Sequence, residues 1–155
     1  MSADHVPSPE PDLAPAGEII AETTALTLAT LDEDGWPRAT PLFFAADDRL
    51  CLYFLSEAGS RHSQNLAREP RAAAGLFPSV SDWREIRGLQ IQGTVSPLAG
   101  AEREEALALY ARRFPFVADL VDAVHSSEVF RLTPSWIRLI DNRRGFAFKQ
   151  EWTLP

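Results

Sequence analysis

Short stretches of apolar and β-branched residues, several alternating with polar residues, make up most of the chain after its first sixteen positions. A period of two is typical of strands that bury one face. Turn signals at Asp34-Gly35 and Asp47-Asp48 join the first three strands, which we expect to form an antiparallel meander. The predicted strands cover residues 25–32, 36–46, 49–56, 71–77, 86–95, 128–134 and 135–141, and residues 145–152 add an edge piece.

Helical periodicity occurs in few places. Residues 101–114 repeat apolar side chains at spacings of three and four, and their acidic start and basic end suit the helix dipole. Shorter helices are predicted at residues 18–23, 60–68 and 117–124. Strands and helices do not alternate as in a doubly wound sheet, and many strands with few helices tend to close into a barrel. The sequence therefore predicts a mainly β fold, an antiparallel barrel of about six to eight strands with two or three peripheral helices.

The length of 155 residues predicts one domain. Residues 1–16 are rich in proline and acidic residues and are expected to form a disordered tail, so the domain covers residues 17–155. The formal net charge of −7 argues against nucleic acid and anionic membranes as partners, and no apolar run is long enough to cross a bilayer. The single cysteine, Cys51, allows no internal disulfide and fits a reducing, cytoplasmic location.

Several kinds of chemistry lack their motifs in this chain. There is no glycine pattern of a dinucleotide or P-loop site and no G-x-S-x-G nucleophile elbow. The three histidines, His5, His62 and His125, lack the spacing of metal ligands, so no metal site is expected. No side chain stands out as an acid or base, and the catalytic residues are unassigned.

One segment has the features of an anion site. After the third predicted strand, Ser60 is a good N-cap for a helix, and Arg61 and His62 follow in its first turn. Cations there face the positive end of the helix dipole, which is unfavourable unless an anion such as phosphate binds between them. Arg38, on the second strand, can supply a further cation. The alternative is that Arg61 and His62 simply point into solvent, and the pattern alone does not decide between the two.

Three segments of the chain resemble the pyridoxamine 5′-phosphate oxidase-like, FMN-binding split-barrel flavoproteins. They are residues 36–44 (WPRATPLFF), residues 55–73 (LSEAGSRHSQNLAREPRAA) and residues 88–95 (GLQIQGTV), within a likeness that covers roughly residues 18–142. The ending, residues 141–152, is similar to a branch of small members rather than to the vitamin-making oxidases. The resemblance implies an antiparallel split β-barrel that forms a homodimer, with each flavin in a groove between two barrels.

The resemblance also assigns cofactor-binding residues. Arg38 matches the arginine that meets the FMN phosphate, and Ser60, Arg61 and His62 match the phosphate-holding trio. The oxidases usually carry lysine at the last of these positions, so His62 is a departure that weakens the positive charge at neutral pH. Gln90 matches a glutamine that touches the flavin, with its register shifted by two residues. The full set of expected FMN contacts is Arg38, Ala39, Thr40, Leu55, Ser56, Ser60, Arg61, His62 and Gln90.

The resemblance implies a flavin-dependent oxidoreductase that acts on an unknown small molecule, with FMN carrying the hydride or electron. The arginine- and histidine-containing stretch with which the oxidases close their substrate site is missing, so oxidation of pyridoxine phosphate is not expected. A second hypothesis is a non-catalytic binding or sensing domain that holds FMN, a haem-like or another phosphorylated ligand, or nothing. A third hypothesis is that a deazaflavin replaces FMN.

Overall fold

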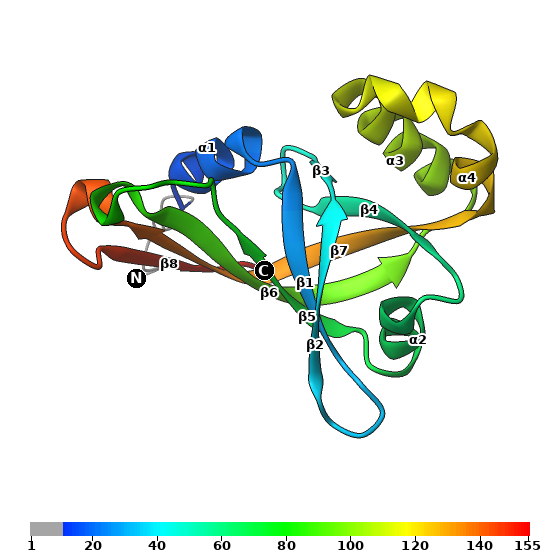
Figure 1. Ribbon diagram of the computed structural model, residues 1–155, viewed down its shortest axis with the longest axis horizontal. Coiled ribbons are helices and arrows are strands. Elements are labelled where there is room, and N and C mark those ends of the chain that lie inside the picture. The colour runs from blue at the N-terminus through cyan, green and yellow to red at the C-terminus, as the bar shows by residue number, and fades with distance from the viewer. Residues whose placement is uncertain (1–10) are drawn as a thin grey trace, which may run out of the picture.

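The computed structural model describes residues 11–155, and in this part of the chain eight antiparallel strands form one curled sheet (Figure 1). This confirms the expected mainly β, split-barrel fold. Residues 1–10 of the predicted tail lie outside the described residues. The strands are β1 (Ala25–Leu31), β2 (Pro37–Phe43), β3 (Ala45–Ala46), β4 (Leu52–Glu57), β5 (Arg71–Leu76), β6 (Arg87–Pro97), β7 (Ser127–Asp141) and β8 (Lys149–Thr153).

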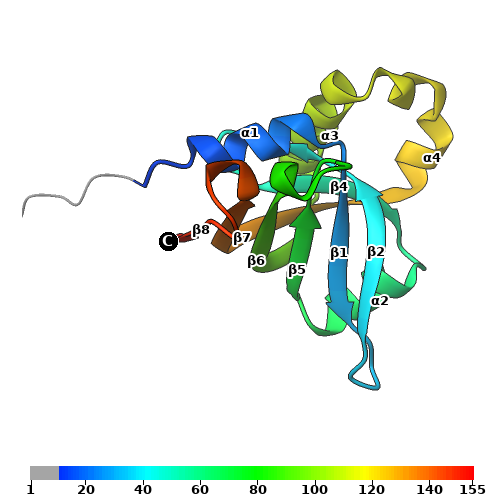
Figure 2. The ribbon, with the colours of Figure 1, turned by 60° about the vertical axis from the view of Figure 1, so that its left-hand side comes forward.

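The sheet curls because the strands at its two edges, β2 and β3, follow each other directly in the sequence. The strand order is β2-β1-β5-β6-β7-β4-β3, and β8 pairs with the part of β7 that β4 does not reach, on the edge opposite β6. Only Phe44 separates β2 from β3 in the sequence. Phe44 is fully buried, and its backbone N–H donates to the carbonyl of Thr24 at 3.1 Å. The chain therefore leaves one end of the sheet at Phe43 and joins the other end at Ala45, which draws the sheet into a half-barrel (Figure 2).

Strand alternation decides which side chains form the core. In β6, Leu89, Ile91 and Val95 are buried while Gln90 and Gln92 are exposed, as their alternation predicted. The core fills the inner, concave face of the sheet. The opposite face of β1, β5 and β6, called the outer face below, carries Thr27, Ala29, Ala73, Gly75, Gln90 and Gln92.

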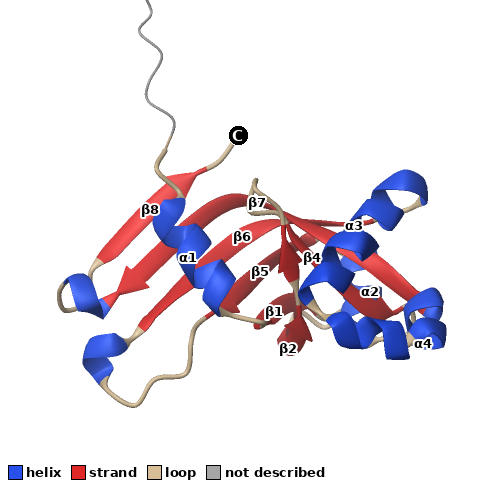
Figure 3. Ribbon diagram, turned by 90° about the horizontal axis from the view of Figure 1, so that it is seen from above, coloured by secondary structure: helices blue, strands red, loops and turns tan. Residues whose placement is uncertain are grey.

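Four α-helices lie around the sheet in the described residues (Figure 3). Helix α1 (Ala14–Glu22) crosses β6 and β7 and buries Ile19 and Ile20 in the core. Helix α2 (Arg61–Arg68) packs against β1. Helices α3 (Gly100–Arg113) and α4 (Val121–Ser126) form a separate lobe beside β4 and β7. No helix in the described part of the chain is long and apolar enough to cross a membrane.

Three details differ from the expectations. The expected second strand, residues 36–46, is divided at Phe44 into β2, which pairs with β1, and β3, which pairs with β4, so the antiparallel meander is interrupted and β4 also pairs with β7 at the other end of the sheet. The strands expected at residues 128–134 and 135–141 are one strand, β7, because Ser135 forms a bulge opposite Gln92 and Gly93 rather than a break. Helix α1 begins at Ala14 and buries Ala16, so residues 14–16 belong to the fold instead of the tail.

Candidate functional site

The candidate site lies where β4 ends and α2 begins. Ser60 is the N-cap of α2 in an extended conformation, and its Oγ accepts a hydrogen bond from the backbone N–H of Ser63 at 3.3 Å. The same hydroxyl lies 2.8 Å from Ser63 Oγ. Helix α2 thus starts where the sequence predicts, and its N-terminal end faces the last residues of β4.

His62 is turned inward and belongs to a cluster of serine hydroxyls. Its Nε2 lies 2.5 Å from Ser56 Oγ and 3.3 Å from Ser60 Oγ, and the two hydroxyls are 3.0 Å apart. Only 8% of the residue is exposed, and this burial lowers the pKa of His62 below its usual range. Burial thus favours the uncharged imidazole, whose Nε2 lies within hydrogen-bond distance of both serine hydroxyls.

Arg38 and Arg61 converge on one buried carboxylate, that of Asp32. Arg38 donates to it through two nitrogens: Nη2 lies 2.6 Å from Oδ2, and Nε lies 2.9 Å from Oδ2 and 3.1 Å from Oδ1. Arg61 Nη1 lies 3.6 Å from the same Oδ2. The Asp32 side chain is 2% exposed, whereas those of Arg38 and Arg61 are 48% and 63% exposed. The two guanidinium groups therefore lie side by side over a buried anion and remain open to solvent.

The Asp32 carboxylate is ionised throughout the physiological range. The hydrogen bonds from Arg38, followed by the one from Asn65, lower the pKa of Asp32 to about 2. Asn65 Nδ2 donates to Asp32 Oδ1 at 2.7 Å and lies 3.1 Å from Thr30 Oγ1. Sequence reasoning missed both Asp32 and Asn65. The signal was present for Asp32, because it continues the inward-facing alternation of Leu28 and Thr30 in β1.

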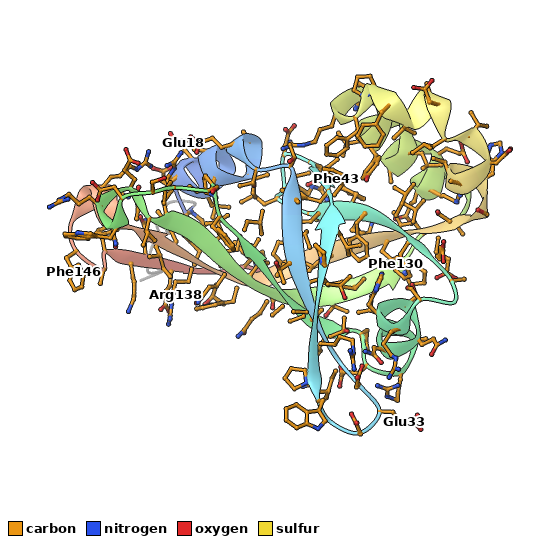
Figure 4. All side chains as sticks on the ribbon, viewed as in Figure 1. Glu18, Glu33, Phe43, Phe130, Arg138 and Phe146 are labelled. Atoms are coloured by element: carbon orange, nitrogen blue, oxygen red, sulfur yellow. The ribbon has the colours of Figure 1, made fainter. Side chains whose placement is uncertain are left out.

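The remaining expected contacts do not gather at this point within one chain. Ala39 faces outward opposite Ala29, and Thr40 is half-buried and lies opposite Leu28. Leu55 packs beside the aromatic rings of the α3 lobe. Gln90 lies on the outer face, opposite Arg138 of β7. Figure 4 shows Arg138 well apart from Glu33, the neighbour of Asp32 at the β1–β2 turn.

The outer face around Gln90 is hollowed. A depression of about 580 Å³ is lined by small side chains of β1 and β5, by Gln90 and Gln92, and by Trp136 and Arg138. The Arg138 guanidinium carbon lies 5.1 Å from the centre of the Trp136 ring, and its Nη2 pairs with Glu151 at 2.6 Å. A second depression of about 470 Å³ continues across the same strands toward Pro37 and Arg71. The outer face is thus broad and shallow, with only small side chains on β1 and β5 between Thr27 and Ala29 and between Ala73 and Gly75.

Fold and site together define a split-barrel domain in which two arginines converge on a buried carboxylate near the start of its second helix. The family model of pyridoxamine 5′-phosphate oxidase matches residues 16–141, and the chain belongs to this family. A UPF0306 protein of Enterobacter sp. (strain 638) is 31% identical over 114 residues, which cover 74% of this chain and 77% of that protein.

Two solved structures share the fold at low sequence identity. One is described as a haem-binding protein from Mycobacterium smegmatis, with a TM-score of 0.78, 23% identity, and coverage of 94% of this chain and 60% of that one. The other is HutZ, a haem storage protein from Vibrio cholerae, with a TM-score of 0.69, 18% identity, and coverage of 90% and 92%. At these identities the likeness establishes the fold alone.

Proposed function

We propose that this protein binds FMN and acts as a flavin-dependent oxidoreductase on a small molecule. The observation that carries the proposal is the arginine pair. Arg38 from β2 and Arg61 from α2 meet over Asp32, and both keep much of their side chain exposed. Guanidinium groups that converge from separate elements suit the planar, bidentate recognition of a phosphate.

The groups beside the arginine pair fit the phosphate of FMN. Ser56 and Ser60 supply hydroxyls, and the backbone N–H groups in the first turn of α2 add the positive end of the helix dipole. Arg38, Arg61 and Asp32 together carry two positive charges and one negative charge, a net charge of +1. When bound, FMN supplies the hydride or one-electron chemistry, and the chain supplies binding and orientation.

We further propose that two copies of the chain pack through the outer face. The small side chains of β1 and β5 leave this face flat, and the hollow beside Gln90, Trp136 and Arg138 lies open on it. Apart from Arg71 at the start of β5, the strands β1 and β5 present no charged residue on this face, which suits a homodimer, and the hollow offers room for part of a flavin. The free thiol of Cys51, which is buried, suits a cytoplasmic location for such a dimer.

The test is the affinity for FMN of the double variant Arg38→Ala/Arg61→Ala, measured by quenching of flavin fluorescence. We expect at least a tenfold loss, because each charge-assisted hydrogen bond contributes roughly 1.5–3 kcal/mol. The matched control is Arg84→Ala/Arg131→Ala, which also removes two arginines that pair with carboxylates, at 3.2 and 2.7 Å, elsewhere on the surface. Equal losses in both double variants would show general electrostatics rather than a phosphate seat. Competition with a deazaflavin decides between the two cofactors.

Haem is the second candidate ligand. The haem-related descriptions of the two solved structures motivate it, and His125, exposed on α4, is available as an iron ligand. Addition of haem to the purified protein should then give a Soret band that His125→Ala shifts or abolishes. A haem complex formed in this way, together with colourless protein after incubation with FMN, would replace the flavin proposal.

A further inference from the structure

Asp32 occupies a fixed position between the two arginines. Its backbone N–H donates to the carbonyl of Trp36 at 2.8 Å, and its own carbonyl accepts from Gly35 at 2.9 Å, so the β1–β2 turn holds the residue at both ends. The side chain faces inward beneath the turn and is almost completely buried. An ionised carboxylate in such a place needs partners, and its partners are Arg38, Arg61 and Asn65.

We propose that Asp32 is a positioning residue, which holds Arg38 and Arg61 side by side in the orientation that receives the phosphate of FMN. This inference rests on the proposed function. Arg38 and Arg61 carry like charges on long flexible side chains from different elements, so without an anchor they would separate and sample many rotamers. The buried carboxylate offsets their repulsion and leaves the outward edges of both guanidinium groups for a ligand.

Asn65 in turn fixes the carboxylate. Its side-chain Nδ2 bonds Asp32 Oδ1, and its Oδ1 accepts from Arg68 Nη2 at 3.3 Å. Arg68 Nη2 also donates to the carbonyl of Leu31 at 2.6 Å, which ties α2 to the end of β1. Asn65 thus holds Asp32 Oδ1, which Arg38 Nε also contacts, and Oδ2 lies against both arginines.

The direction in which one substitution changes the affinity for phosphate distinguishes a positioning role from simple charge neutralisation. Asp32→Asn removes a negative charge next to the site, and Coulomb's law alone predicts tighter binding of a phosphate dianion. If Asp32 orients the arginines, the same change weakens binding of the phosphate. Riboflavin lacks the phosphate, so its affinity reports on the flavin-binding surface without the arginine pair.

The experiment measures the affinities of FMN and riboflavin for the full chain and expresses them as a ratio. We expect Asp32→Asn to lower the FMN-to-riboflavin ratio at least tenfold while the far-ultraviolet circular dichroism stays that of the wild type. The matched control is Asp141→Asn, because Asp141 is also a buried carboxylate gripped by one arginine, with Oδ2 2.9 Å from Arg143 Nη2. This control should leave the ratio unchanged.

A ratio that is unchanged or raised in Asp32→Asn overturns the positioning role. If that variant does not fold, Asn65→Ala provides the measurement. It keeps every charge and removes the bond that turns the carboxylate, together with the contacts of Asn65 to Thr30 and Arg68. We expect at least a threefold fall in the ratio, and no change refutes the inference. Wild-type protein that does not prefer FMN to riboflavin overturns the proposed function itself. A wild-type preference that survives both substitutions overturns only the role of Asp32.

Discussion

Alanine at Gly93 should damage the sheet where β6 crosses the bulge of β7. A Cβ built on Gly93 would lie 2.2 Å from the carbonyl oxygen of Thr133, 2.9 Å from its carbonyl carbon and 3.1 Å from Leu132 Cδ2, whereas ordinary contacts begin at 3.4 Å. The two strands would have to separate by about 1 Å. Such overpacking costs roughly 1–3 kcal/mol, and the loss of one or two ladder hydrogen bonds adds about 1 kcal/mol each. We therefore expect Gly93→Ala to lower the free energy of unfolding by about 2–5 kcal/mol, a large share of the ~5–15 kcal/mol of a typical domain.

Chemical denaturation followed by tryptophan fluorescence measures this loss, and a thermal scan should show Tm lowered by roughly 4–20 °C. Gly17→Ala is the matched control, because nothing lies within 4 Å of a Cβ at that position in α1. Alanine there should raise stability by up to about 1 kcal/mol, since it favours the helix. If Gly93→Ala unfolds at the wild-type denaturant concentration, the close approach of β6 to Thr133 is not a real constraint, and the account of the bulge is wrong.

Two further predictions concern the site and the outer face. Burial lowers the pKa of His62, so as the pH falls the unfolded chain takes up a proton at this residue, near pH 6.5, before the folded chain does. The free energy of unfolding should therefore fall as the pH drops below about 6.5. His62→Gln should flatten this pH dependence in denaturation curves between about pH 5 and 8, and the control His125→Gln, on exposed α4, should not. Gly75→Arg adds a side chain that projects from the outer face and whose Cβ meets nothing within 4 Å in one chain, so it should give folded monomers in light scattering if two copies pack there. Dimers of wild-type size would exclude this face.

Local structure could be predicted well because each signal lay within a few neighbouring residues. The alternation of Gln90 and Gln92 with Leu89 and Ile91 fixed the faces of β6, and Ser60 marked the start of α2. The pairing of β4 with β3 was expected from the Asp47-Asp48 turn, but its pairing with β7 could not be predicted from proximity in sequence, because the bend at the buried Phe44 carries the chain to the other end of the sheet. A turn signal indicates that the chain reverses, but it does not specify the strand that pairs next.

The sequence predicted the two arginines of the candidate site, but not the buried Asp32 carboxylate on which they converge. Arg38 and Arg61 were expected near one another from helix-start chemistry and family resemblance, and both meet Asp32. Asp32 was taken as the end of a strand, since a single acidic residue before a turn has an ordinary role as a turn former. His62 was expected at the phosphate with a weakened positive charge, or else in solvent, but its burial against Ser56 depends on the way α2 packs against β1, which local sequence does not encode.

The separation of Arg38 from Gln90 bears on whether one chain can form a complete flavin site. Arg38 pairs with the inward-facing Thr30, whereas Gln90 faces outward opposite Gly75. Two strands, β1 and β5, lie between β2 and β6, so the two side chains are three strand spacings apart, roughly 14 Å, and on opposite faces of the sheet. A flavin that touches both kinds of residue therefore has to lie between two copies, with the arginine pair from one and the outer face from the other. Gly75→Arg tests this as well: a monomer that still binds FMN with wild-type affinity would mean that Gln90 takes no part and that the arginine side of a single chain is sufficient.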